Sequence, residues 1–131
     1  MTTSTPPAAK AVKLDDVFAA LADDTRRRIL GLLASGEICV CHIHEALDVP
    51  QSTASRHLAH LRKAGLVTTR KDGLWVHYRL EDLSDPAVAG VLRSTLAALH
   101  ATEGTGQDRK KLSRLIQVPL KTLEKAAKCC C

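Results

Sequence analysis

The side chains best suited to chemistry in this 131-residue sequence are its five cysteines. They form an internal pair and a terminal triplet: Cys39 and Cys41, then Cys129, Cys130 and Cys131. The opening residues, MTTSTPPAAK, lack the apolar segment of a secretory signal, so we expect a cytoplasmic, reducing location. In that environment thiols bind metal ions or undergo redox chemistry more often than they form structural disulfides.

The sequence offers little for catalysis. The internal pair is spaced C-x-C, whereas thiol oxidoreductases use C-x-x-C. Neither a phosphate-binding glycine loop nor a Ser/His/Asp set is suggested by the positions of the residues. No run of about 18 apolar residues indicates a membrane span. We therefore predict that the protein is neither an enzyme nor a membrane protein.

The pair opens a short helix expected over residues 39–47, with Ile43, Ala46 and Leu47 on its inner face. Side chains two residues apart on a regular helix point to nearly opposite sides. One ion can therefore bind both thiols only if Cys39 lies outside the helix or the first turn unwinds. A helix N-terminus also lowers the pKa of a thiol, which favours metal capture.

A second helix is expected almost at once, from about Gln51 to Ala64. The segment Asp48-Val49-Pro50 predicts the turn between the two, because a residue before proline avoids the α region and proline suits the first turn of a helix. Ala54, Leu58 and Leu61 fall at helical spacing and should be buried.

The sequence after Gly65 predicts a β-hairpin around Asp72-Gly73, with strands over 67–70 and 74–80. Residues 51–80 hold six Lys/Arg against one Asp/Glu, which suits a DNA phosphate backbone, although a solvated basic face is the alternative. The N-terminal turns of a recognition helix read base edges, and basic residues of the hairpin reach phosphates. The candidate DNA-binding residues are Gln51, Ser52, Thr53, Ser55, Arg56, His57, His60, Lys63, Arg70 and Lys71.

We expect a mainly α fold with a β-hairpin wing, that is, a dimeric winged helix-turn-helix. A helix is expected from Ser84-Asp85-Pro86 to near His100, with two apolar stripes, one for its own domain and one for a second copy. We expect three regions: a disordered arm over 1–11, the DNA-binding and dimerisation domain over 12–101, and a basic tail over 102–131. The tail should begin with a linker over 102–108 (TEGTGQD) and ends in the cysteine triplet.

The block 37–80 resembles the ArsR/SmtB family of metal-sensing repressors. STASRHLAHLRKAGLV and DGLWVHYRL are similar to that family's reading helix and wing, and the resemblance covers about Leu14 to His100. It implies a homodimer on double-stranded operator DNA. EICVC is similar to the thiol motif of the arsenite and cadmium–lead branches; the arsenite motif continues to a third cysteine where this chain has His44. The zinc-sensing branch has a second site, but its Asp and His are absent near Ala87 and Ala89, so we expect no zinc site there.

The resemblance and the thiols together suggest a repressor that As(III) or Sb(III) releases from DNA. Both are thiophilic and favour three sulfurs, whereas Zn(II) and Cd(II) prefer four ligands. The third sulfur would come from the terminal cysteine triplet, or His42 and His44 would complete a mixed site. Ligation would distort the thiol-bearing helix and shift the reading helix. The alternatives are a Cd(II)-, Pb(II)- or Zn(II)-sensing repressor of the same fold and a thiol redox sensor.

Overall fold

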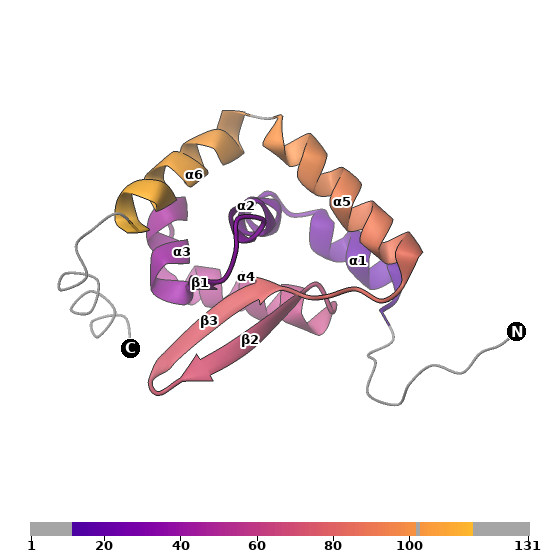
Figure 1. Cartoon of the computed structure of the whole chain (residues 1–131), viewed down its shortest axis with the longest axis horizontal. Helices are drawn as coiled ribbons and strands as arrows, with labels where there is room; N and C mark the ends of the chain where they lie inside the picture. The colour runs from indigo at the N-terminus through magenta and orange to yellow at the C-terminus, as the bar shows by residue number, and fades with distance from the viewer. Residues whose placement is uncertain (1–11, 102, 117–131) are drawn as a thin grey trace, which may run out of the picture.

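The computed structural model describes residues 12–101 and 103–116. In this part of the chain the secondary structure is mainly helical, with one small antiparallel sheet (Figure 1). The expected fold class, a helical domain with a β-hairpin wing, is confirmed. In chain order the elements are α1 (Leu14–Leu21), α2 (Asp24–Leu33), β1 (Ile38–Cys39), α3 (Val40–Leu47), α4 (Gln51–Lys63), β2 (Val67–Asp72), β3 (Trp75–Leu80), α5 (Pro86–His100) and α6 (Glu103–Ile116).

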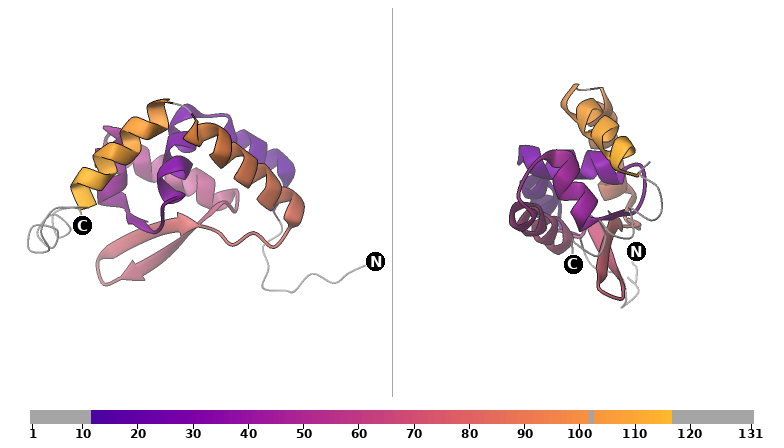
Figure 2. Two further views of the ribbon diagram at one scale, coloured as in Figure 1. Left: turned by 45° about the horizontal axis from the view of Figure 1, so that its top comes forward. Right: turned by 90° about the vertical axis from the view of Figure 1, so that its left-hand side faces the viewer.

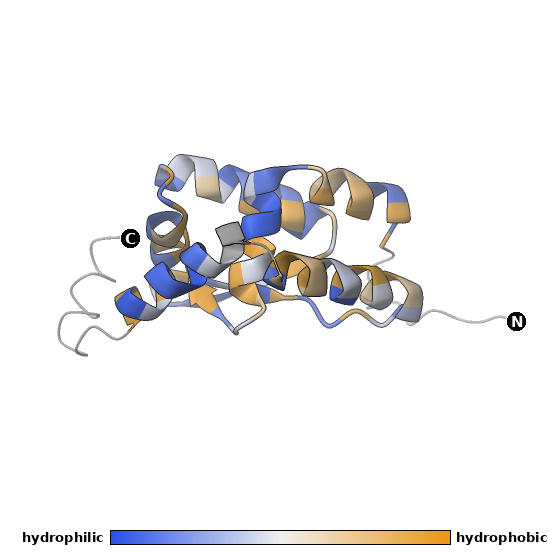
Figure 3. Ribbon diagram, turned by 90° about the horizontal axis from the view of Figure 1, so that it is seen from above, coloured by the Kyte–Doolittle hydropathy of each residue, from blue (hydrophilic) through white to orange (hydrophobic). Residues whose placement is uncertain are grey.

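Helix α2 forms the centre of the domain, and it contacts each of the other five described helices (Figure 1). Its residues 29–33 are all buried, because four of the five are large aliphatic side chains. The hairpin of β2 and β3 extends away from the helical layer in every view (Figure 2). Seen from above, α5 is largely apolar in colour and α6 largely polar (Figure 3). The buried residues of α2 are aliphatic, as expected in a chain with only three aromatic residues.

Side-chain caps determine where α2 and α5 begin. The Asp23 carboxylate accepts a hydrogen bond from the Arg26 backbone N–H at 3.0 Å, and the Asp85 carboxylate accepts one from Ala87 N–H at 2.9 Å. Each cap satisfies one of the N–H groups that a helix start leaves without an intrahelical partner. Pro86 follows its cap at the first helical position, where a missing N–H costs nothing. The predicted bounds of α5 are confirmed.

The turn between α3 and α4 depends on a left-handed residue. Asp48 has φ 57° and ψ 49°, a conformation that Asp tolerates better than most non-glycine residues. The N–H of Val49 then reaches back to the His44 carbonyl at 3.1 Å and closes the end of α3. Pro50 is the residue before α4, which begins at Gln51 as predicted.

The sheet has the order β1-β3-β2, and both pairings are antiparallel. Gly73 and Leu74 form a two-residue hairpin turn, and Gly73 has φ 65°, which glycine adopts without strain. The second strand therefore begins at Trp75, not at Leu74 as expected. The two-residue strand β1 was not predicted, because so short a segment shows no alternating pattern.

Helix α6 replaces the linker expected over 102–108. It begins at Glu103 and continues to Ile116. Asp108 and Leu112 are buried, and α6 packs against α3 and α2. These tertiary contacts outweigh the weak helix propensity of the Thr and Gly residues in this segment. The predicted N-terminal arm (1–11) and the terminal cysteine triplet lie outside the described residues.

Within the described ranges, no helix is long and apolar enough to cross a membrane.

Candidate thiol site and nucleic-acid interface

The two internal cysteines lie on either side of a boundary between elements. Cys39 is the last residue of β1 and the N-cap of α3, with φ −70° and ψ 145°, so its backbone is extended. Cys41 is the second residue of α3. The geometric condition set by their spacing is therefore met, because Cys39 lies outside the helix. Their Sγ atoms are 3.2 Å apart, and the Cys41 thiol donates a hydrogen bond to the Cys39 sulfur.

This hydrogen bond changes the acidity of Cys39. It is the main cause that lowers the pKa of the Cys39 thiol from its ordinary 9.0 to about 6. The Cys41 backbone N–H and the charges of His77 and His42 act in the same direction, while burial opposes them. Cys39 is therefore a thiolate at neutral pH, the form that binds soft ions. Both side chains are buried, with exposed fractions of 5% and 0%.

Among residues 12–101 and 103–116, no group of three or more His, Cys, Asp or Glu residues is placed to hold a metal ion. His44 lies in the last turn of α3, and its Nδ1 is 3.3 Å from the Val49 carbonyl oxygen. That contact links His44 to the turn before α4. His42 is half-buried in the first turn of α3. The described chain thus supplies a two-sulfur site.

Helix α4 presents a polar face opposite a buried one. Ala54, Leu58 and Leu61 are buried as predicted. Of the candidate DNA-binding residues on this helix, the exposed ones are Gln51, Ser52, Arg56, His60 and Lys63, and the half-buried ones are Thr53, Ser55 and His57. The first turns of α4 are thus polar and accessible, as a recognition helix requires.

His57 does not belong to this polar face. Its side chain is only 16% exposed, and its Nδ1 lies 3.7 Å from an Asp23 carboxylate oxygen and 3.3 Å from Arg26 Nη1. Arg26 also donates to the carbonyl oxygens of Ala19 and Ala20 at the end of α1. His57 therefore connects α4 to the start of α2, and this structure gives it partners within the chain that the sequence did not predict. The sequence could not show this, because its partners are about 30 residues away.

The two candidate DNA-binding residues of the wing, Lys71 and Arg70, differ in their surroundings. Lys71 is exposed near the tip of the hairpin. Arg70 instead forms a two-pronged ion pair with Glu37, with Nη2 2.6 Å from Oε1 and Nε 3.1 Å from the same oxygen. This pairing lowers the pKa of the Glu37 carboxyl through the Arg70 hydrogen bonds. Arg70 is thus not simply a free cation of the wing.

A second ion pair, which the sequence analysis missed, joins three helices. Arg28 of α2 donates to both carboxylate oxygens of Asp108 on α6, at 2.8 and 2.7 Å, and to the Leu47 carbonyl at the end of α3 at 3.2 Å. Asp108 is the only buried charged or polar residue of the described chain. Because Arg28 bridges α6 and the end of α3, helix α6 is fixed against the thiol-bearing helix.

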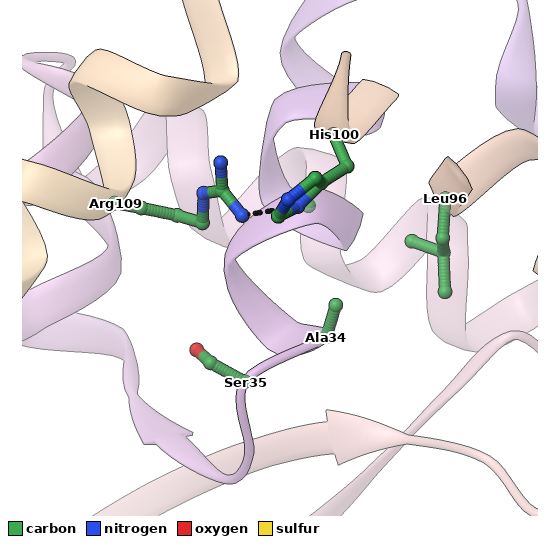
Figure 4. Close-up of a pocket in the computed structure, with 6 residues that line it drawn as sticks. Ala34, Ser35, Leu96, His100 and Arg109 are labelled. Atoms are coloured by element: carbon green, nitrogen blue, oxygen red, sulfur yellow. Dashed lines mark hydrogen bonds between the residues drawn. The ribbon is translucent and has the colours of Figure 1, made fainter. Parts of the chain in front are cut away.

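His100, at the end of α5, lies on a cavity of about 230 Å³ between α2, α5 and α6 (Figure 4). Its Nδ1 contacts the Arg109 guanidinium, and Ala34, Ser35 and Leu96 form part of the wall. Ala87 and Ala89 stand where the zinc-sensing branch would need ligands. His100 is therefore a surface histidine that connects α5 to α6.

Two helices joined by a tight turn, followed by a paired hairpin, define the chain as a winged helix-turn-helix regulator. Its residues 23–69 match the model of a family described as "Bacterial regulatory protein, arsR family". The chain belongs to the ArsR family. That family consists of transcriptional regulators, so the prediction that the protein is not an enzyme is confirmed.

Named relatives support this assignment. The chain is 46% identical over 83 residues to the arsenic resistance transcriptional regulator ArsR1 of Pseudomonas putida, a match that covers 63% of this chain and 65% of that protein. It is 38% identical over 95 residues to the arsenical resistance operon repressor of Bacillus subtilis, covering 72% of this chain and 88% of that protein. A solved structure, the AntR antimony-specific transcriptional repressor, is similar with a TM-score of 0.52 and 28% identity, over 76% of this chain and 96% of that one.

Proposed function

We propose that the protein is a homodimeric transcriptional repressor that binds operator DNA and is released when As(III) or Sb(III) binds the thiols of Cys39 and Cys41. The observation that carries the proposal is the position of the pair. Two buried sulfurs lie 3.2 Å apart at the start of the helix that precedes the reading helix. The names of the relatives, which refer to arsenic and antimony, point to the same class of ligand.

The closeness of the two sulfurs supports a shared ion. The Sγ atoms lie 3.2 Å apart, within reach of one ion that bonds sulfur at about 2.3 Å. The Cys39 thiolate would displace one hydroxide from As(OH)3, and the Cys41 thiol would displace a second, its proton leaving with that hydroxide as water. The third bond requires a further ligand, for which we propose one cysteine of the terminal triplet.

Release follows from the burial of the pair. An ion reaches both sulfurs only if the first turn of α3 opens, because neither thiol is exposed. Helix α3 packs against α4, and its C-terminal end is joined to the turn before α4 by the contact of His44 with Val49. A displaced α3 therefore moves α4. The ion would bind the displaced form better than the DNA-bound form, and this difference in affinity drives release.

The DNA interface would combine α4 and the wing. Gln51, Ser52, Thr53, Ser55 and Arg56 would face base edges, and His60, Lys63, Arg70 and Lys71 would approach phosphates. A second copy would dock on α5, where Ala87 and Ala98 are exposed and Val91 is half-buried beside the buried Val88. Dimerisation would place two reading helices on a two-fold operator.

The proposal is tested by titration of purified dimer on a fluorescent operator selected by the protein from a random DNA library. We expect arsenite and antimonite to lower the anisotropy of the DNA, whereas Cd(II), Pb(II) and Zn(II) at equal concentration do not. Release by the divalent ions alone would instead identify a Cd/Pb/Zn sensor. Release by peroxide without any ion, reversed by dithiothreitol, would identify a thiol redox sensor, and a DNA complex unaffected by all of these would refute ligand-controlled repression.

A further inference from the structure

The strand that carries the thiol pair is part of the wing sheet. In the β1–β3 pairing Cys39 lies opposite His77, and in the β3–β2 pairing His77 lies opposite Arg70. Side chains of directly opposed residues in antiparallel strands project from the same face. Cys39, His77 and Arg70 therefore form one row across the sheet, from the thiol site to the wing.

Glu37 pairs with Arg70, the residue at the wing end of this row. Glu37 lies two residues before Cys39, just before β1, and its carboxylate accepts three contacts from Arg70, at 2.6, 3.1 and 3.2 Å. The other end of the guanidinium is 3.9 Å from an Asp72 oxygen. The exposed fractions are 52% for the Arg70 side chain and 29% for Glu37, so the pair is accessible to DNA. The charge of Arg70 is thus neutralised by carboxylates in the DNA-free protein.

A guanidinium held in this way competes with phosphate. Its planar donors match a carboxylate and a phosphate equally well, so Arg70 cannot offer the same N–H groups to both. A two-pronged contact of Arg70 Nε and Nη2 with an operator phosphate therefore requires that Glu37 release these two groups. Glu37 directly precedes the two-residue strand β1, which ends at Cys39, so its position depends on that of the thiol site.

We propose that Glu37 is a positioning residue that withholds Arg70 from the operator backbone and couples the wing to the thiol site. The DNA-bound form has Arg70 on a phosphate, and the ion-bound form has Arg70 on Glu37. Ion binding at Cys39 and Cys41 fixes β1 and with it the Glu37–Arg70 pair, so the ion acts on the wing as well as on α4. This inference rests on the proposed function, and it adds a second route from the ligand to DNA.

The test is a double-mutant cycle on operator affinity in the ion-free, full-length dimer, with Glu37→Gln, Arg70→Gln and the combined variant. We expect Glu37→Gln to bind about threefold tighter and to steepen the dependence of log K on log salt by about 0.9, because Arg70 then contacts its phosphate without leaving an unpaired carboxylate that takes up a cation. We expect Arg70→Gln to bind more weakly. In the Arg70→Gln background the Glu37→Gln change should have no effect. Glu45→Gln, which removes an exposed charge from α3, is the matched control.

Two results would overturn the proposal. If Glu37→Gln raises affinity equally with and without Arg70, the carboxylate only repels DNA at long range. If it leaves affinity and salt dependence unchanged, Arg70 is not withheld. Affinity and salt dependence are both measured without arsenite, so their outcome does not depend on whether arsenite is the inducer. In a second measurement, arsenite should release Glu37→Gln less completely than the wild type at saturating ion, while the thiolate-to-arsenic absorbance at saturation is unchanged; a full release would contradict the coupling.

Discussion

Arg28 on α2 holds Asp108 on α6 through two parallel hydrogen bonds of 2.8 and 2.7 Å, and the same guanidinium reaches the last carbonyl of α3. The pair joins residues 80 positions apart and fixes α6 against the thiol-bearing helix. The Asp108 hydrogen bond also raises the pKa of Arg28, so the guanidinium stays charged. Any movement of α3 must therefore be accommodated by α6.

We expect Asp108→Asn to lower the free energy of unfolding by about 2–4 kcal/mol, because it leaves a partly buried guanidinium without its counter-charge. Urea denaturation measures this directly. Asp24→Asn is the matched control: it removes the exposed partner of Arg27, 3.7 Å away, and should cost less than about 0.5 kcal/mol. Equal effects of the two substitutions would show that α6 does not depend on the Arg28–Asp108 pair.

The acidity of Cys39 gives a spectroscopic prediction. In a variant with serine at 129–131, thiolate absorbance near 240 nm should rise with a midpoint at about pH 6, the pKa of Cys39. Cys41→Ala removes the hydrogen bond and leaves burial, which favours the neutral thiol. The midpoint should then move upward from about 6, while the Cys41 backbone N–H and the charges of His77 and His42 still oppose burial. A midpoint that stays near 6 would mean that Cys41 does not cause the shift.

The same pKa makes stability depend on pH. Because the pKa of Cys39 is lowered on folding, the unfolded chain binds more protons between about pH 6 and 9.0. The stabilisation is complete above pH 9.0 and is lost as pH falls towards 6. We therefore expect the free energy of unfolding of the wild type, minus that of Cys39→Ser, to increase as pH rises through this range. A difference that is constant with pH would contradict a lowered pKa.

Much of this fold was predictable from sequence, where local chemistry determines the structure. The Asp85-Pro86 start of α5 and the buried face of α4 follow from capping and periodicity. The missed features depend on distant partners. Helix α6 forms although its sequence suggests a linker, because Asp108 and Leu112 are buried against α2 and α3. Likewise, His57 is paired within the chain, because Asp23 and Arg26 lie beside it.

The same distinction holds for the site. The C-x-C spacing predicted that the thiols share an ion only if Cys39 lies outside the helix or the first turn unwinds, and Cys39 lies in β1, outside α3. The sequence could not show that β1 pairs with the wing, since a two-residue strand has no periodicity. Nor could it show that Arg70 is paired with Glu37, 33 residues earlier in the chain.

The turn before the reading helix offers a test of backbone strain. Asp48 has φ 57°, where a side chain other than Asn or Asp is disfavoured. Asp48→Ala should lower the free energy of unfolding by about 1 kcal/mol, and Asp48→Gly should not lower it. Thermal unfolding followed by circular dichroism distinguishes the two variants. If alanine and glycine have the same effect, the left-handed conformation is not what this position contributes.

The terminal triplet is the proposed source of the third sulfur. Substitution of Cys129, Cys130 and Cys131 by serine should leave operator binding intact and raise the arsenite concentration for half-release by about tenfold, because one bond to the ion is lost. Single cysteine restorations would then show which position restores the response. An unchanged arsenite response in the triple variant would exclude the triplet as a ligand.

The central claim is that a soft ion on Cys39 and Cys41 displaces the protein from DNA. The most direct test is the anisotropy of a labelled operator bound by Cys39→Ser/Cys41→Ser as arsenite is added. The two serine side chains are nearly isosteric with cysteine. We therefore expect the double variant to bind the operator normally and to stay bound at arsenite concentrations that fully release the wild type. Release of the double variant by arsenite at the wild-type concentration would contradict the account.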